Sequence, residues 1–519
     1  MLYIFRVEDL RLLCEEMALN SLTCSVICLL LLLFITCVSA TPSMPSLSVL
    51  GITKQSHRRL TPFSFPSRDF NTYFYTQKLD HFNYRAESQA TFQQKYVINS
   101  KFWGGANSSA PIFVYLGANA PLDDQIRRIG FMTDNAPQFN ALLVYIEHRF
   151  YGQSTPFGSS EEAYQNDRTL DYLNLSQTLE DYAEVILDIK KNLSANNSTP
   201  VIVIGGSYGG VLATLFRLRY PYIALGALAS SAPILYLDGL KPQLQDGYFS
   251  IVSKDFREAS ESCYNTIQQS WSEIDKIASQ EDGLSVLSRR FNTCTPLENS
   301  SWLKDALKLV YAAAAQYDAP QINQAVNLIC TAIDRATNGT DVLDKVIAAM
   351  FAFFSKYPGP HEYCDEMHQW AWNWQICTEI LIPTGISGTD TMFQAEPFNL
   401  TSYKETCKGL YDLRLMPEPF WITSQFGGQD VKLVLGRFGS NIIFSNGLRD
   451  PFSAGGVLES LSDSLVALPT AKGSHCLDIY AALPNDPDWL IVQRRSELKI
   501  ISQWIAQYHM DRAANISYI

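Results

Sequence analysis

The stretch PVIVIGGSYGGVLATLFR, residues 200–217, decides the fold class of this chain. It opens with a run of β-branched residues, passes through Gly-x-Ser-x-Gly at 205–209 and ends in an apolar run at helical spacing. A strand, a tight turn and a helix in this order are typical of a nucleophile elbow, in which small flanking residues let strand and helix pass closely. A glycine-rich phosphate loop is the alternative, but it would need a lysine after the glycines. We therefore expect Ser207 to stand at the tip of the elbow.

Apolar runs on both sides of the elbow have the length of buried strands. They lie at residues 111–116, 141–146, 201–204, 225–230, 441–445 and 465–468. Helical spacing at 179–192 suits a crossover helix, and a last helix is expected over 492–508. Strands that alternate with helices predict a sheet covered by helices, which together with the elbow indicates an α/β-hydrolase fold.

The middle of the chain has a different character. Strand-like alternation fades there, and helical patterns appear at 264–280, 303–316 and 341–357. We expect one α/β-hydrolase domain in two parts, 71–239 and 426–519, interrupted by a helical cap at 240–425.

A serine hydroxyl needs a histidine to take its proton and a carboxylate to orient that histidine. The chain order in this fold is serine, acid, histidine. The histidines after Ser207 are His361, His368, His475 and His509. We expect His475 to be the base, because it lies in a glycine-containing loop after the run at 465–468. We expect Asp450 to be the acid, because it follows the strand at 441–445 and precedes a proline that stiffens the backbone. Its rivals are Asp463, Asp478 and Asp486.

The same fold predicts where an oxyanion would be stabilised. One backbone N–H should come from Tyr208, the residue after the nucleophile. The second should come from the loop after the strand at 111–116, at Ala118 or Asn119.

The beginning of the chain reads as a secretory signal. Residues 17–40 carry no charge, contain a run of leucines and end in Val38-Ser39-Ala40, a small-x-small cleavage pattern. We expect a cleaved signal peptide at 1–40, with Met1 or Met17 as the start, and a flexible leader at 41–70. An uncleaved signal anchor is the alternative. After cleavage we expect no stable membrane anchor.

Two features agree with passage through the secretory pathway. The chain has nine Asn-x-Ser/Thr sequons, at Asn107, Asn174, Asn192, Asn196, Asn197, Asn299, Asn338, Asn399 and Asn515. Six cysteines cluster within the cap, and Cys476 stands apart. An even cluster in an oxidising compartment predicts three disulfides, of which spacing alone leaves the pairing open. We expect Cys476 to be a buried free thiol.

The formal net charge of −12 argues against nucleic acid as a partner. We expect no metal and no cofactor.

Several motifs together resemble the family of serine peptidases that contains lysosomal Pro-X carboxypeptidase and dipeptidyl peptidase II, with most likeness to its plant members. The motifs are Gln77–Phe82, Glu147–Gly152, Gly205–Gly210, Trp374–Glu379, Asn446–Pro451 and Gly473–Asp478. They span about residues 73–510, nearly the whole mature chain.

The resemblance implies a serine exopeptidase that cleaves on the carboxyl side of proline, with Ser207, Asp450 and His475 as its triad. It implies vacuolar, lysosomal or extracellular location, peptide substrates with a proline near one end, and admits a homodimer. It further implies disulfides pairing Cys263 with Cys330, Cys294 with Cys364, and Cys377 with Cys407. We expect the substrate pocket to contain Phe452, Trp374, Gln375 and Val211.

The chain departs from the family pattern at three places. It has Asn119 where the family usually carries a glutamate, Phe452 in place of a tryptophan, and Tyr480 where some members have an arginine. Phe452 can still pack on a proline ring, but recognition of a substrate terminus is put in question. Three alternatives stay open: a dipeptidyl peptidase, an esterase or acyltransferase with the same triad, and a catalytically inactive binding protein.

Overall fold

The computed structural model describes residues 69–516, apart from 84–88, 109, 165–166, 196–198, 239–240, 294, 320–323, 338, 357–368, 389, 412–420 and 427–429. The predicted signal peptide, nearly all of the leader, His361, His368 and the predicted Cys294–Cys364 pair lie outside the described residues. So do the sequons at Asn196, Asn197 and Asn338.

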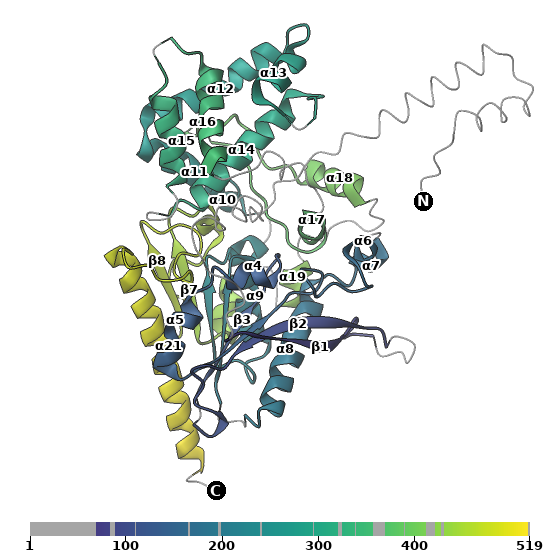
Figure 1. Ribbon diagram of the computed structural model, residues 1–519, viewed down its shortest axis with the longest axis vertical. Coiled ribbons are helices and arrows are strands. Elements are labelled where there is room, and N and C mark those ends of the chain that lie inside the picture. Colours follow the sequence, from purple (N-terminus) through teal and green to yellow (C-terminus); the bar gives the residue numbers. More distant parts are fainter. Residues whose placement is uncertain are drawn as a thin grey trace, which may run out of the picture.

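An eight-stranded sheet forms the centre of the molecule (Figure 1). Its strands are β1 (Asn71–Lys78), β2 (Thr91–Asn99), β3 (Ile112–Leu116), β4 (Leu142–Ile146), β5 (Val201–Gly206), β6 (Gly226–Ser230), β7 (Ile442–Gly447) and β8 (Leu465–Thr470). They lie in the order β1-β2-β4-β3-β5-β6-β7-β8. The pairs β1–β2 and β2–β4 are antiparallel, and all the others are parallel.

The parallel strands are covered on both faces, which explains why β3 to β7 read as continuous apolar runs. Along β3, Val114 packs in the core that includes Leu179 and Leu212, from α8 (Leu175–Asn192) and α9 (Tyr208–Arg219). The adjacent Phe113 points to the other face, in the core with Ala136 and Ile501. Those two residues come from α5 (Phe131–Phe139) and α21 (Asp488–Ile516).

A helical cap lies between β6 and β7 in the chain, and we define it by its helices. These are α10 (Pro242–Gln245), α11 (Gly247–Ala259), α12 (Glu261–Ala278), α13 (Gly283–Phe291), α14 (Ser300–Gln316), α15 (Ala325–Asp334), α16 (Val342–Lys356), α17 (Gln369–Thr378) and α18 (Leu400–Tyr411). Most of them stack above the sheet in Figure 1. The sequence expectations for 264–280, 303–316 and 341–357 correspond to α12, α14 and α16.

Short elements complete the fold. They are α4 (Leu122–Ile126), α6 (Ser160–Ala163), α7 (Asp167–Leu170), α19 (Trp421–Gln425), α20 (Val431–Phe438), η1 (Ala106–Ser108), η2 (Ile234–Asp238) and η3 (Pro451–Gly455).

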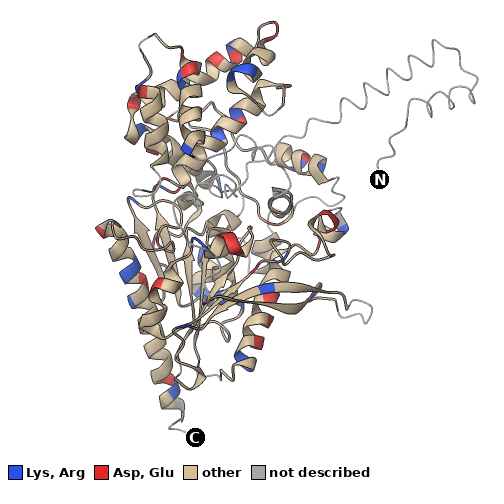
Figure 2. Ribbon diagram, in the orientation of Figure 1, with Lys and Arg blue, Asp and Glu red and all other residues tan. Residues whose placement is uncertain are grey.

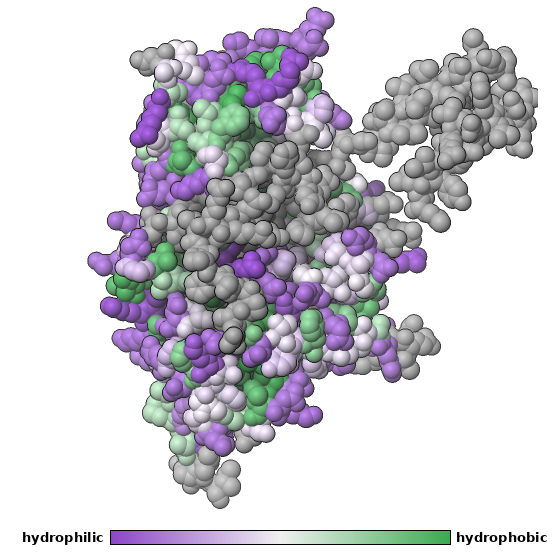
Figure 3. All heavy atoms as spheres, viewed as in Figure 1, coloured by the Kyte–Doolittle hydropathy of each residue, from purple (hydrophilic) through white to green (hydrophobic). Residues whose placement is uncertain are grey.

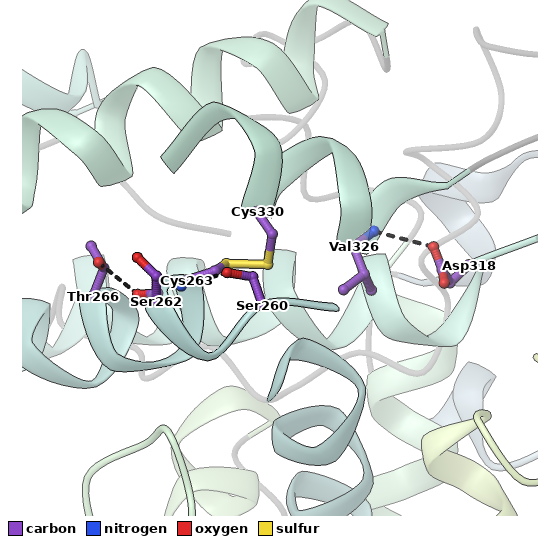
Figure 4. The surroundings of a disulfide bond; sticks show 7 residues. All are labelled: Ser260, Ser262, Cys263, Thr266, Asp318, Val326 and Cys330. Carbon is purple, nitrogen blue, oxygen red and sulfur yellow. Dashed lines mark hydrogen bonds between the residues drawn. A yellow bond between two sulfur atoms is a disulfide. The ribbon is translucent and has the colours of Figure 1, made fainter. Parts of the chain in front are cut away.

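Disulfides staple the cap internally. Cys263 of α12 bonds Cys330 of α15 (Figure 4), and Cys377 of α17 bonds Cys407 of α18. These are two of the three pairs that the resemblance implies. Cys476 is a buried free thiol, as expected.

The surface is mixed in charge and polarity. Charged residues are spread over the cap helices and α21 and are sparse in the central strands (Figure 2). Hydrophilic residues cover much of the upper end of the cap on the face shown in Figure 3. Within the described part of the chain, no helix has the length and hydropathy needed to cross a bilayer.

Candidate active site

Ser207 stands at a strained turn between β5 and α9. Its φ of 58° and ψ of −124° put the backbone in a region that non-glycine residues rarely adopt. The turn is held because the Ser207 N–H donates to the Ser230 carbonyl at 2.9 Å, and the Ser207 carbonyl accepts from the Val211 N–H at 3.1 Å. A Cβ on Gly205 would lie 1.9 Å from the Gly209 carbonyl oxygen, so only glycine fits there. Residues 201–219 therefore form the strand, tight turn and helix that the sequence predicts.

His475 and Asp450 form a buried pair. Asp450 follows β7 and caps η3, where its Oδ1 accepts the Phe452 N–H at 3.0 Å. Its Oδ2 lies 2.6 Å from His475 Nδ1. Asp450 is thus the carboxylate that contacts His475. Two of its rivals have other partners, because Asp478 accepts from Ser230 Oγ and Asp486 accepts from Arg494. The third rival, Asp463, is exposed.

Charge dominates the behaviour of the His475 ring. Burial by itself lowers the pKa of His475, but the charges and hydrogen bonds of Asp450 and Cys476 together outweigh it and raise that pKa well above its usual value. Because Nδ1 faces the carboxylate, Nδ1 carries the proton in the neutral ring and Nε2 is left as the acceptor.

The cap takes part in holding this histidine. The His475 N–H donates to the Gln316 carbonyl at 3.0 Å, and the ring of Tyr317 meets the imidazole edge-on with centroids 5.7 Å apart. Gln316 is the last residue of α14, and Tyr317 follows it directly. Nothing in the spacing of the sequence connects them with His475, so sequence reasoning missed them.

Ser207, His475 and Asn119 line one cavity of about 70 Å³. Tyr208 begins α9, so its N–H has no acceptor within the helix and is available to an oxyanion. The prediction for Ala118 needs correction, because its N–H already donates to Gln125 Oε1 at 2.9 Å. Asn119, the other residue of this loop expected to supply the second N–H, lines the same cavity as Ser207.

A buried polar network surrounds the side chain of Tyr208. Gln375 of the cap donates to the Tyr208 hydroxyl at 2.9 Å and accepts from the Tyr151 hydroxyl at 2.8 Å. Burial lowers the pKa of His148 to about 4, so this ring is neutral. His148 Nδ1 lies 2.6 Å from its neighbour's carbonyl and must donate, which leaves Nε2 to accept from Tyr208 at 3.2 Å.

Glu379 closes this network on the cap side. Its carboxylate accepts from the Leu175 N–H at 2.8 Å and from Gln375 Nε2 at 3.1 Å. Burial raises the pKa of Glu379 to about 7, although both hydrogen bonds oppose the rise. The side chain of Tyr208 is therefore linked through Gln375 to a titratable group of the cap.

A pair of buried acids, Asp478 and Glu497, lies behind the site. Asp478 Oδ1 accepts from Ser230 Oγ at 2.5 Å, and Glu497 Oε1 accepts from Ser445 Oγ at 2.7 Å. Burial raises the pKa of both carboxyls, and the neighbouring Asp478 charge and hydrogen bond raise that of Glu497 further. The Ser230 carbonyl also holds the elbow, so this acid pair supports the turn at Ser207.

Of the four residues predicted to form the substrate pocket, Phe452 alone lines one of the two cavities described here. Phe452 lines a larger cavity of about 380 Å³ that also contains Tyr248 and Ile382. Trp374, Gln375 and Val211 do not line it. Gln375 uses both ends of its amide in the Tyr208 network, so it is a structural neighbour of the site and not a pocket wall.

The described sequons differ in exposure. Asn107, Asn192, Asn299 and Asn399 are exposed, and Asn174 is half-buried. No group of three or more potential metal ligands occurs among the described residues.

A mostly parallel sheet of this order, with a serine at the elbow after its central strand, defines an α/β hydrolase. The family model of serine carboxypeptidase S28 matches residues 77–497, and the chain therefore belongs to that family. It is a serine peptidase.

Related proteins cover nearly the full length. The chain is 33% identical to lysosomal Pro-X carboxypeptidase of Mus musculus, over 93% of this chain and 98% of the relative. It is 31% identical to that of Homo sapiens, over 93% and 97%. Thymus-specific serine protease of Homo sapiens is 26% identical, over 83% and 86%. Among solved structures, an acetylester hydrolase from Corynebacterium glutamicum aligns with a TM-score of 0.39 at 11% identity, covering 83% of this chain and 96% of that one.

Proposed function

We propose that this serine peptidase is an exopeptidase that cleaves on the carboxyl side of proline, through an acyl-enzyme on Ser207. The observation that supports this chemistry is the proximity of the Ser207, His475 and Asp450 side chains. His475 and Ser207 line one cavity, and Asp450 lies 2.6 Å from the far nitrogen of His475.

The reaction has two halves. Ser207 Oγ attacks the scissile carbonyl carbon while His475 Nε2 takes the hydroxyl proton, and Asp450 stabilises the imidazolium that forms. The oxyanion lies against the N–H groups of Tyr208 and Asn119. The imidazolium then gives its proton to the leaving amine, and an ester remains on Ser207. Water, deprotonated by His475, releases the acyl product and restores the serine.

Proline preference is supported by the apolar wall beside the base. The ring of Phe452 lies 5.6 Å from that of His475 and 4.9 Å from that of Tyr248, measured between centroids. Phe452 also lines the larger cavity, where Phe249, Ile376 and Ile382 add apolar surface. A pyrrolidine ring has no donor to satisfy and fits such a wall. Two relatives are named Pro-X carboxypeptidases, which agrees with this preference.

We propose an acidic compartment of the secretory pathway, vacuolar or lysosomal, as the location. The disulfides of the cap favour an oxidising route of synthesis. The relatives are named lysosomal.

The test uses the purified protein and its Asp450→Asn variant on an N-blocked peptide ending in Pro-X. We expect release of X alone, and a kcat lower by about 10⁴-fold in the variant, because the neutral amide no longer fixes the His475 tautomer. Asp463→Asn is the matched control, since that carboxylate is exposed and should leave kcat unchanged. Equal kcat for Asp450→Asn and the wild type would rule out the mechanism. Cleavage of the unblocked peptide only, with release of its N-terminal dipeptide, would indicate a dipeptidyl peptidase.

A further inference from the structure

An arginine lines the catalytic cavity. Arg128 borders the same cavity of about 70 Å³ as Ser207 and His475. Among the residues that the structure describes, its side chain makes no hydrogen bond and no ion pair. The preceding Arg127 behaves as surface arginines do, because it is exposed and lies 3.8 Å from Asp124. A half-buried guanidinium without an anion is uncommon and indicates that a ligand supplies the anion.

The backbone of Arg128 is fixed to both walls of the cavity. Its N–H donates to the Gln125 carbonyl at 2.9 Å, and Gln125 also holds the loop of Ala118. Its carbonyl accepts from the Ala481 N–H at 3.1 Å, on the segment that follows His475. These two hydrogen bonds therefore fix the position of the Arg128 backbone relative to Ser207 and His475.

The rest of the cavity wall suits an anion. Three tyrosines line it, Tyr115, Tyr317 and Tyr480, and burial raises the pKa of each hydroxyl. The positive charge of Arg128 opposes that rise at all three, so its guanidinium acts on these hydroxyls. The Tyr115 hydroxyl already donates to Gln125 Oε1 at 3.1 Å, so the neutral hydroxyls of Tyr317 and Tyr480 are the ones that can donate to an anion. The described residues that line the cavity include no aspartate or glutamate.

Substrate chemistry places a carboxylate near this guanidinium. When a single C-terminal residue is released, its α-carboxyl carbon is separated from the scissile nitrogen by one Cα atom, roughly 2.5 Å away. The group that recognises it must therefore lie in the cavity of Ser207 and His475. A dipeptidyl peptidase instead needs an anionic group for the substrate's ammonium.

The geometry points to Arg128 as the residue that binds the free α-carboxylate of the residue that leaves. This inference rests on the proposed exopeptidase function and selects the carboxypeptidase over the dipeptidyl peptidase. A guanidinium can engage a carboxylate with two parallel hydrogen bonds, which adds geometric selectivity to charge. Arg128 is then a specificity residue that distinguishes a chain end from an internal peptide bond.

The test compares N-acetyl-Ala-Pro-Phe as free acid with the same peptide as its C-terminal amide. We expect wild-type enzyme to prefer the acid. Arg128→Gln should lower kcat/KM for the acid by roughly 10- to 100-fold, because a charged hydrogen-bond partner is lost, and should leave the amide nearly unchanged. Arg128→Lys should recover part of the loss, since it restores the charge without the fork. Arg127→Gln is the matched control and should behave as wild type.

Equal losses for acid and amide in Arg128→Gln would overturn the inference, because they would indicate a structural role. A wild-type enzyme that cleaves the amide as fast as the acid would overturn it as well. Calorimetric binding of both peptides to Ser207→Ala protein, with and without Arg128→Gln, separates this inference from the proposed function. Suppose that the free acid binds tightly, that this binding depends on Arg128, and that the wild type does not hydrolyse the peptide. This result would refute the proposed exopeptidase function but leave the carboxylate site at Arg128 intact.

Discussion

Replacing Glu379 with glutamine should change how stability depends on pH. The Glu379 carboxyl is buried where α17 meets α8, and burial raises its pKa from 4.5 to about 7. The native state therefore holds this proton more tightly than the unfolded state. Stability is greatest below the unfolded value and is lost as pH rises toward the native value. A difference of roughly 2.5 pKa units corresponds to about 3 kcal/mol.

Glutamine cannot ionise, so Glu379→Gln should lack this loss. It should carry instead a penalty at every pH, because one of the donors from Leu175 and Gln375 meets an N–H group in place of an oxygen. The free energies of unfolding of wild type and variant should thus converge as pH rises from about 5 to about 8.

Urea unfolding followed by tryptophan fluorescence across this range measures the difference directly. Glu459→Gln, at an exposed carboxylate beyond η3, should run parallel to the wild type at all pH values. A difference between wild type and Glu379→Gln that stays constant with pH would refute the reasoning. A wild type that gains stability relative to the variant as pH rises would refute it too.

Three further predictions concern the elbow, the cap and the acid pair. Gly205→Ala should abolish labelling of Ser207 by a fluorophosphonate, because the new Cβ meets a carbonyl oxygen at 1.9 Å; normal labelling would contradict this. Gly436→Ala, on a helix with nothing within 4 Å of the new Cβ, is its control and should stabilise the fold by about 0.5–1 kcal/mol. Removing the Cys263–Cys330 bond by a double alanine substitution should cost about 4 kcal/mol, because the bond closes a loop of 67 residues; an unchanged urea midpoint would disprove it. Glu497→Gln keeps an acceptor for Ser445 and presents an amide donor to Asp478. Because the variant cannot ionise, it should lose less stability than wild type as pH rises from about 5 to about 8, and identical pH dependence of the two melting curves would contradict the raised pKa of Glu497.

Much of the sheet could be read from the sequence because its central strands are covered on both faces. Such strands appear as short, continuous apolar runs, and β3 and β4 each lie within one residue of the runs that predict them. The hairpin of β1 and β2 was not predicted, because most of β1 is exposed and its residues show no clear alternation. The cap helices α11, α13 and α15 were also missed. None of them has a side-chain hydrogen bond at its N-cap, so their starts carry no strong local signal.

In the candidate site, too, residues set by local sequence patterns could be predicted, and residues brought in by tertiary contacts could not. Ser207 was recognisable because an elbow is a local pattern, and Asp450 and His475 because their order along the chain limits the choice. The expectation for Ala118 was wrong because Gln125 takes its N–H, a contact that no spacing rule reveals. Arg128 and Tyr317 reach the cavity only through tertiary folding.

The hydrogen bond from the His475 N–H to the Gln316 carbonyl limits how this enzyme could be simplified. A version trimmed to its sheet would keep the turn of Ser207, which is built from β5, β6 and α9, but would leave the buried N–H of His475 without an acceptor. Exchanging the cap for that of another peptidase would have to reproduce one backbone carbonyl at the end of α14 as well as the shape of the pocket. A redesign of the cap therefore has to treat the end of α14 and the loop of His475 as one unit.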